Sequence, residues 1–490
     1  MKNTRFASCV LFLITATTFA QFDTDLLSDW RHAGINAFLW PKWKEVTLNC
    51  DEHNCDEALQ SLLNESRHPL VINIPEGNYV FKKAINLPSH TLLRGEGSEK
   101  TVLIFDVPNG AHSITARAPV RSRKRFQLKE TPQRNDTTLV FELSNAVKVG
   151  DHLRLIYNDE VITLRDWGRN TTGQLVRVSS VDGNNVYVDS PFRLRYSRWF
   201  DLHVEVIEPV EEVGIEQLSI IRRSPSDRQV SNVFFEGVYR GYLYGVRSDS
   251  CHYAHLDART SRFIHVEKCY FNEAHDYGEG GKAYGVMLQM GTCDSRVTDN
   301  AFSALRHAMI VQAGANGNVF GYNYSTDVKA TRVLFGRSIS HTLSGDMVVH
   351  GNYPYANIFE GNRAHMGIID NAHGENGPGN TYYRNHVRPH GITLTNPSTV
   401  NCVFIENSTA GLSFFLGARH FRQGNSFDIS AARPSEEINS LGFDVFPQGV
   451  IEDFIRHIGA GSANDKQLPA EIRFYQQTFT PQSGSLLIHE

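Results

Sequence analysis

Short hydrophobic runs separated by turn residues dominate the first hundred positions of the chain. Between residues 70 and 97, apolar stretches of three to five residues alternate with Gly, Pro and Asn, so the chain turns every six to ten residues. This spacing is typical of short strands in an all-β fold. Just before them, residues 56–63 have apolar positions at helical spacing and begin with two acidic residues, which predicts a short helix.

A longer repeat runs through residues 287–407. Five units each place a polar residue after two mostly hydrophobic positions and end on an asparagine. The polar residues are Gln289, Gln312, His350, Asp370 and Thr395, and the asparagines are Asn300, Asn323, Asn362, Asn385 and Asn407. Successive asparagines are 23, 39, 23 and 22 residues apart. Steps of 22 or 23 suit one coil of a parallel β-helix, and the step of 39 predicts an extra loop within 325–345. We interpret the asparagines as a stacked amide ladder or as left-handed turn residues.

The pieces that follow the short helix resemble a known superfamily. In order, they are Ile74-Pro75-Glu76-Gly77-Asn78-Tyr79, Leu87-Pro88-Ser89 and Leu93-Arg94-Gly95-Glu96-Gly97-Ser98. Together with the helix they resemble the opening of the pectate-lyase-like right-handed parallel β-helix superfamily, which contains polysaccharide lyases and related glycoside hydrolases. The resemblance implies a right-handed parallel β-helix that acts on carbohydrate. It does not extend to the catalytic motifs of the superfamily's pectate lyases or polygalacturonases.

The hydrophobic pattern divides the chain into five segments. Residues 1–20 combine Lys2 and Arg5 with an apolar run and small residues before Gln21, which predicts a signal peptide and an exported, secreted or periplasmic protein. Residues 21–115 form an N-terminal cap with the first coils, and residues 116–210 form an inserted β-rich domain with a hairpin turn at Asp182-Gly183-Asn184. Residues 211–430 form the main β-helix, and residues 431–490 form a C-terminal cap or tail.

Composition excludes several classes of protein. The chain is 41% hydrophobic and 21% charged, with a formal net charge of −5, which is unfavourable for nucleic-acid binding. Without an apolar run of eighteen residues it has no membrane span, and we expect a monomer. Six cysteines follow the signal peptide. Cys50 and Cys55 are close enough to form a disulfide across a short turn, and the other four are interpreted as buried apolar residues.

Residues at matching positions of a β-helix stack above one another, so the polar column forms one face. Histidine and arginine concentrate around it: Arg306, His307, His341, His350, Arg363, His365, His373, Arg384, His386, Arg388 and His390. A turn-rich loop from Asp370 to Asn380 lengthens one coil. Loops on a rigid scaffold often carry function. We therefore predict a catalytic site of His350, Asp370 and His373 with Arg306 or His307. Gln289, Gln312, Arg384, Tyr284 and Tyr353 are the predicted substrate-binding residues.

This site favours a secreted polysaccharide lyase that cleaves an anionic, uronate-containing polysaccharide by β-elimination. A neutral histidine would remove the proton next to the uronate carboxylate, and an arginine would bind that carboxylate. Two alternatives stay open. One is a glycoside hydrolase with paired carboxylates, and the other is a non-catalytic, tailspike-like carbohydrate-binding solenoid. Asp370, Glu375 and Glu360 are oxygen ligands of the kind that Ca²⁺ takes, but their spacing matches no calcium loop, so the metal is left unknown.

Overall fold

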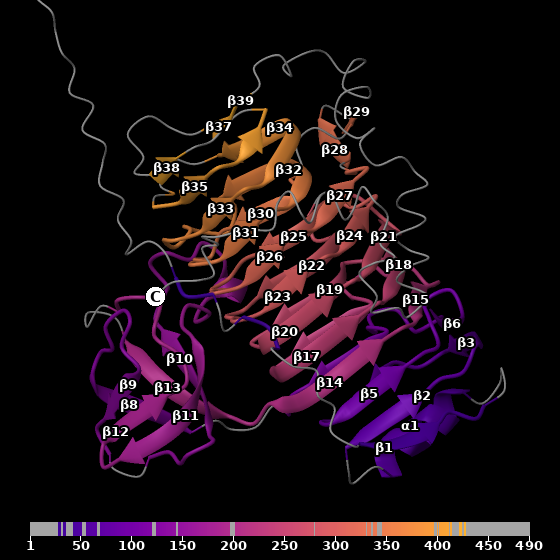
Figure 1. Ribbon diagram of the computed structural model, residues 1–490, viewed down its shortest axis with the longest axis horizontal. Coiled ribbons are helices and arrows are strands. Elements are labelled where there is room, and N and C mark those ends of the chain that lie inside the picture. Colours follow the sequence, from indigo (N-terminus) through magenta and orange to yellow (C-terminus); the bar gives the residue numbers. More distant parts are fainter. Residues whose placement is uncertain are drawn as a thin grey trace, which may run out of the picture.

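The computed structural model describes residues 28–30, 33–35, 43–50, 55–65, 69–119, 124–143, 146–196, 201–278, 280–329, 331–334, 337–340, 345–395, 399, 401–410, 412–413, 421–423 and 426–427. Two long sheets of parallel strands wind into a solenoid that rises through the coils, with a smaller barrel at its side (Figure 1). The predicted right-handed parallel β-helix with a capping helix and a β-rich insertion is confirmed.

The first sheet has twelve strands among the described residues, one from each coil. They are β1 (Lys44–Thr47), β2 (Leu70–Asn73), β5 (Thr91–Arg94), β14 (Val210–Glu216), β17 (Val238–Tyr244), β20 (Arg262–Glu267), β23 (Arg296–Thr298), β26 (Val319–Gly321), β31 (Ile358–Glu360), β33 (Thr381–Tyr383), β35 (Val403–Ile405) and β38 (Phe421–Gln423). Each pairs in parallel with the strand one coil earlier.

The second sheet has nineteen strands in the described ranges and bends around two faces of the solenoid. The first face holds β3 (Gly77–Phe81), β6 (Thr101–Phe105), β15 (Ser219–Arg222), β18 (Arg247–Cys251), β21 (Tyr270–Ala274), β24 (Ala301–Ser303), β27 (Tyr324–Thr326), β36 (Ser408–Thr409) and β39 (Ser426–Phe427). The second face holds β4 (Ile85–Asn86), β7 (Ile114–Arg117), β16 (Val233–Glu236), β19 (Ala254–Arg259), β22 (Tyr284–Gln289), β25 (His307–Val311), β30 (Met347–His350) and β37 (Leu412–Ser413). Two longer strands, β32 (Arg363–Asp370) and β34 (His386–Leu394), run through both faces.

The predicted asparagine ladder is present at the corner between the first sheet and the first face of the second. The side-chain amide of each asparagine donates to the carbonyl of the next at 3.0 Å, from Asn300 through Asn323, Asn362 and Asn385 to Asn407. The side-chain oxygen of each asparagine from Asn323 to Asn407 also accepts the backbone N–H of the ladder asparagine one coil earlier. The step of 39 residues contains a hairpin of β28 (Thr331–Leu334) and β29 (Arg337–Ser340), which confirms the extra loop.

The solenoid core is a continuous column of side chains that repeat from coil to coil. Phe320, Phe359, Tyr382 and Phe404 stack with ring centroids 5.2, 5.0 and 5.5 Å apart. The cysteines that follow the cap, Cys251, Cys269, Cys293 and Cys402, are buried and unbridged, as predicted. Burial raises the pKa of each of the last three thiols to about 12, so these are inert packing residues.

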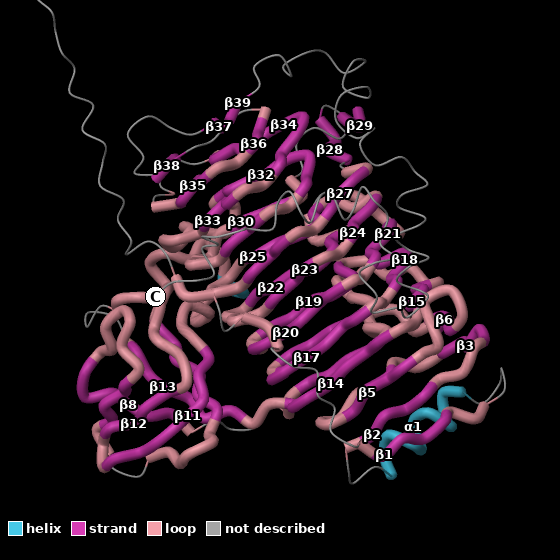
Figure 2. The backbone as a smooth tube through the Cα atoms, viewed as in Figure 1, coloured by secondary structure: helices cyan, strands magenta, loops and turns pink. Residues whose placement is uncertain are grey.

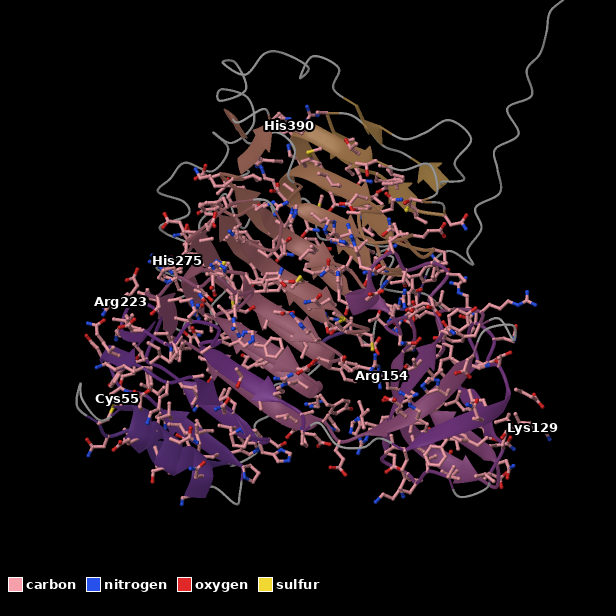
Figure 3. The ribbon with its side chains drawn as sticks, turned by 180° about the vertical axis from the view of Figure 1, so that it is seen from behind. Cys55, Lys129, Arg154, Arg223, His275 and His390 are labelled. Carbon is pink, nitrogen blue, oxygen red and sulfur yellow. A yellow bond between two sulfur atoms is a disulfide. The ribbon has the colours of Figure 1, made fainter. Side chains whose placement is uncertain are left out.

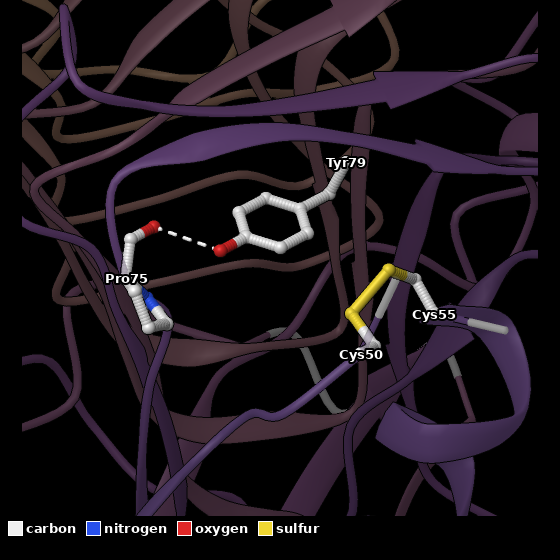
Figure 4. The surroundings of a disulfide bond; sticks show 4 residues. All are labelled: Cys50, Cys55, Pro75 and Tyr79. Atoms are coloured by element: carbon white, nitrogen blue, oxygen red, sulfur yellow. Dashed lines mark hydrogen bonds between the residues drawn. A yellow bond between two sulfur atoms is a disulfide. The ribbon is translucent and has the colours of Figure 1, made fainter. Parts of the chain in front are cut away.

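The one α-helix in the described ranges, α1 (Cys55–Glu65), covers the N-terminal end of the solenoid (Figure 2). Asp56 and Glu57 lie in its first turn, where they complement the helix dipole. The predicted disulfide joins Cys50 to Cys55 at the start of this helix (Figure 4). Nearby, the Tyr79 hydroxyl donates to the carbonyl of Pro75 at 3.2 Å, across the turn before β3.

A closed six-stranded antiparallel barrel interrupts the solenoid between β7 and β14. Its strands are β8 (Arg125–Glu130), β9 (Thr138–Phe141), β10 (His152–Tyr157), β11 (Leu175–Asp182), β12 (Asn185–Val188) and β13 (Leu202–Ile207). The expected hairpin joins β11 to β12, and Gly183 takes a left-handed φ of 60° in its turn. The barrel encloses a hydrophobic core distinct from the main core of the solenoid, and Tyr355 and Ala356 of the solenoid pack into it.

Two predicted segments, the signal peptide at 1–20 and the C-terminal cap or tail at 431–490, lie outside the described residues. Across the part of the chain that is described, α1 is too short to cross a bilayer, and no other helix is long and apolar enough to do so.

The ladder yields a stability prediction. Asn362→Ala removes an amide that donates to the Phe320 carbonyl at 2.8 Å and to Asn385, and an oxygen that accepts from Asn323. Buried partners are left unsatisfied, so we expect the free energy of unfolding to fall by about 1–3 kcal/mol. Urea unfolding measures this, with Asn64→Ala on the exposed side of α1 as control. Equal stability of the two variants would contradict the role of the ladder.

Candidate active site

The predicted polar column runs along the ends of the second-face strands. β30 pairs with β32 so that His350 lies beside Asp370, and β22, β25 and β30 are aligned in the same register. Towards the N-terminus, Gln312 donates its amide to Gln289 at 2.7 Å, and Gln289 donates to Asp257 at 2.7 Å. The column therefore stacks from coil to coil as the sequence period predicted.

His350 and Asp370 form the central contact of the site. Nδ1 of His350 lies 2.7 Å from Oδ2 of Asp370, and Oδ1 of Asp370 accepts the backbone N–H of Ala372 at 2.9 Å. Burial opposes ionisation of Asp370, but the hydrogen bond and charge of His350 outweigh it and hold the pKa of Asp370 below its ordinary value. Because an ionised carboxylate only accepts, Nδ1 of His350 carries the proton and Nε2 is left to act on a ligand.

Two further histidines surround His350. The His373 ring packs edge-on against it with centroids 4.5 Å apart, and the His307 ring lies at 6.0 Å. Burial, followed by the charges of His350 and Arg165, lowers the pKa of His373 to about 4. Burial, followed by Arg306 and His350, lowers the pKa of His307 to about 3. Both rings are therefore neutral at neutral pH. Within the described structure, Nδ1 of His373 is buried without a hydrogen-bond partner.

The inserted barrel supplies one wall of this site. The loop between β10 and β11 pairs with the loop after Asp370: the backbone N–H of Leu164 donates to the His373 carbonyl at 2.9 Å, and Thr163 bridges to Gly374. This loop carries Trp167, which is 43% exposed and meets the His373 ring edge-on at 5.1 Å between centroids. The partly exposed indole therefore adds a large apolar surface next to His373.

Asp159 gives the barrel loop its shape. Its carboxylate accepts three successive backbone N–H groups, those of Asn170, Thr171 and Thr172, at 2.6, 3.0 and 2.9 Å. These bonds close the loop around the turn at Asp166–Gly168 that bears Trp167, and the backbone contacts of Thr163 and Leu164 attach the loop to the solenoid. The wall is therefore a fixed element of the site.

A buried ion network joins the barrel to the solenoid behind this wall. Asp294 of the solenoid lies between two arginines: Arg193 of the barrel, and Arg262, whose Nε donates to it at 2.7 Å. Arg262 also donates to Asp189 of the barrel at 2.8 and 2.9 Å. Arg193 in addition donates to Asn316 at 3.1 Å. Because buried charges are costly unless paired, this network fixes the orientation of the barrel on the coils.

The structure separates several predicted binding residues from the histidines or buries them. Gln289 and Gln312 are 1% and 4% exposed. They lie in the coils before that of His350, where the amide of Gln312 donates to Gln289 and the amide of Gln289 donates to Asp257. Tyr353 packs against the barrel core, and burial raises its pKa to about 12. Arg384 lies at the asparagine corner, where it donates to Glu406 at 2.5 Å, and β34 separates it from the His350 corner. Gln289 and Gln312 are therefore covered, and Arg384 lies away from the His350 cluster.

The remaining predicted residues stay near the cluster. The Tyr284 ring stacks on His307 with centroids 5.1 Å apart and is itself 4% exposed. Strand β25 begins at His307, so Arg306 lies on the turn before the strand. The alternation of side chains along a strand therefore does not place Arg306 and His307 on opposite faces of the sheet. Arg306 is half-buried, donates to the Gly278 carbonyl at 3.4 Å, and lowers the pKa of His307 second only to burial.

The three oxygen ligands suggested for Ca²⁺ do not converge. Asp370 lies at the end of β32, whereas Glu360 ends β31 in the other sheet and accepts the Tyr322 hydroxyl at 3.1 Å. Nowhere in the described ranges do three His, Cys, Asp or Glu side chains come together in a group able to hold a metal ion.

No family model matches the sequence, and no curated protein matches it. Among solved structures, the tailspike gp61 of Pseudomonas phage phi297 is 16% identical, with a TM-score of 0.52 over 76% of this chain and 66% of that one. The tailspike gp49 of Pseudomonas phage LKA1 is 15% identical, with a TM-score of 0.50 over 73% of this chain and 57% of that one. The predicted fold resemblance is confirmed. The chain spans two thirds or less of the length of these tailspikes, and at such identities the likeness extends to the fold alone.

Sequence reasoning missed the residues of the barrel wall. Trp167, Arg165 and Asp159 lie about two hundred positions before Asp370, and no local pattern links the two segments. A second asparagine ladder, Asn318, Asn357 and Asn380, was also missed, although each member precedes a member of the first ladder by five residues. That constant offset was a readable signal. The second ladder lies at the corner that bears His350.

Proposed function

We propose that this protein is a polysaccharide lyase that cleaves a uronate-containing polysaccharide at the corner between the solenoid and the barrel. The observation that carries the proposal is the His350–Asp370 hydrogen bond with the neutral His373 ring packed against it. A histidine held by a carboxylate through Nδ1 is arranged to take a proton at Nε2.

The reaction follows from these positions. Nε2 of His350 removes the proton on the carbon next to the uronate carboxylate, and the resulting charge spreads onto that carboxylate. The adjacent carbon–oxygen bond then breaks, a double bond forms in the ring, and the leaving oxygen takes the proton that Nε2 of His350 removed, which returns His350 to its neutral form. We assign the binding of the substrate carboxylate to Arg165 and Arg306, the cations whose charges lower the pKa of His373 and of His307, respectively. Trp167 supports the sugar ring.

A glycoside hydrolase is the second candidate, and the contacts of Asp370 weigh against it. Hydrolysis uses two carboxylates on either side of the bond that breaks. Both oxygens of Asp370 are already bonded, one to His350 and the other to the Ala372 N–H. Among the described residues, no second carboxylate contacts His350 or His373. A purely binding solenoid would need the aromatic surface but not the histidine–carboxylate pair.

The first test is the product. Incubation with separate homopolymers of galacturonate, mannuronate, guluronate and glucuronate is expected to give, with one of them, an unsaturated product that absorbs in the ultraviolet. Each new reducing end should be accompanied by one unsaturated ring, because elimination makes both in the same step. New reducing ends without ultraviolet absorbance would establish the hydrolase, and neither signal with any polymer would favour the binding solenoid.

The second test concerns the base. His350→Ala is expected to lower kcat by roughly 10²–10⁴-fold, the usual contribution of a general base. Asp370→Asn should also lower kcat with little change in KM, because the side-chain amide does not fix the proton on Nδ1 of His350 as the carboxylate does. His275→Ala serves as control, since His275 is a half-buried histidine with one hydrogen bond to the Arg222 carbonyl. Near-normal kcat in both site variants would rule out this assignment.

We further propose that the protein is exported and loses its first twenty residues. Support comes from the Lys2–Arg5 charge before an apolar run, and from the Cys50–Cys55 disulfide, since such bonds persist in oxidising compartments. N-terminal sequencing of the protein recovered outside the cytoplasm should begin near Gln21. Recovery with Met1 still attached would contradict the proposal.

A further inference from the structure

Residues 28–30 and 33–35, which we call the N-terminal arm, lie across the outer face of the first sheet. Trp30 is fully buried in a cluster over the later coils that includes Val319, Ile358, Tyr383, Val403 and Ile405. Ile35 belongs to a second cluster over the earlier coils, with Val71, Leu92 and Tyr242. Phe320 and Ile72, the neighbours of Val319 and Val71 along the strands, lie in the solenoid core, so both clusters are on the outside of the sheet.

Gly34 brings the arm close to the coils. Its φ of 80° is left-handed, and a Cβ at this position would lie 2.7 Å from the Cβ of Arg296 and 3.1 Å from Nδ1 of His265. Only glycine combines this backbone conformation with such a close approach. The next residue, Ile35, donates its backbone N–H to the same Nδ1 of His265 at 3.2 Å. The arm is therefore attached by hydrogen bonds as well as by apolar packing.

Two further hydrogen bonds end on bends of the solenoid that also contact the barrel. Nε1 of Trp30 donates to the carbonyl of Ala356, just before β31, at 2.7 Å. The backbone N–H of Gly34 donates to the carbonyl of Asp294, just before β23, at 2.7 Å. The Ala356 side chain packs into the barrel core, and the Asp294 carboxylate is paired with Arg193 of the barrel. The arm and the barrel therefore contact the same two bends.

The barrel extends these contacts to the candidate active site. On the loop between β10 and β11, the backbone N–H of Leu164 donates to the His373 carbonyl at 2.9 Å, and the Trp167 ring meets the His373 ring. Figure 3 shows the barrel, with Lys129 and Arg154, beside the coils. A continuous set of contacts thus joins the arm, the two bends, the barrel and His373, and contiguous contacts of this kind carry coupling between distant parts of a protein.

We propose that the N-terminal arm is a clamp that sets the orientation of the barrel on the solenoid, and with it the position of the barrel wall beside His373. Trp30 is a positioning residue in this clamp, because it acts through the bend at Ala356. Without the arm, the barrel would still contact both bends, but the bends would lose their support from the outer face of the sheet. This role does not depend on which reaction the site performs.

Hydrogen exchange of the backbone amides, measured by mass spectrometry of short peptides, tests the clamp in the absence of substrate. In the Trp30→Ala protein we expect the Leu164 amide to exchange about tenfold faster or more, because the barrel loop opens from the His373 carbonyl more often. The Thr172 amide should keep its rate, since its bond to Asp159 lies within the barrel loop and does not depend on how the barrel is oriented.

Ile35→Ala is the matched control. It removes a buried apolar side chain from the same arm, but one that packs over the earlier coils, so the Leu164 amide should keep its rate. If Trp30→Ala does not fold, Trp30→Phe replaces it, since this variant keeps an aromatic ring but loses the hydrogen bond to Ala356.

Two results would overturn the clamp. One is an unchanged rate at Leu164 in the folded Trp30 variant, and the other is an equal acceleration at Leu164 in the Ile35→Ala protein. Acceleration at Leu164 and Thr172 alike would also count against it, because the barrel itself would then have loosened. None of these outcomes depends on the lyase assay.

Discussion

The parallel register between successive coils is the constraint on which the rest of the structure depends. It places each outward side chain beside the one a coil earlier, so His350 lies next to Asp370 although twenty residues separate them. The two asparagine ladders hold this register from both ends of the first-sheet strands: Asn357 and Asn362 flank β31, and Asn380 and Asn385 flank β33. A shift of the strand pairing by one residue would turn the polar side chains of this column inward, into the hydrophobic core.

The barrel turns this repetitive surface into the candidate site. A solenoid face alone offers rows of side chains that are open on one side. The barrel adds Trp167 and Arg165 on a loop shaped by Asp159, and the Asp294 network fixes its position on the coils. The site therefore combines a repeated element, which supplies the histidine–carboxylate pair, with an inserted element, which supplies the aromatic surface and a cation.

The sequence predicted features that repeat at a fixed period, and missed those that depend on contacts between distant segments. The asparagine spacing predicted the ladder, the coil length and the extra loop, because each follows from local pattern. The column was also predicted, but not its burial: Gln289 and Gln312 bond to each other and to Asp257, which no spacing indicates. Arg384 was assigned to the site from composition, whereas its place in the coil puts it at a different corner.

The central claim is that substrate binds at the corner where His350, His373 and Trp167 meet. The most direct test is a crystal structure of the His350→Ala protein with an uncleaved uronate oligosaccharide bound. We expect one sugar ring against the Trp167 indole, and the carbon next to a uronate carboxylate facing position 350 beside His373. An oligosaccharide bound along another face, with this corner left empty, would contradict the account.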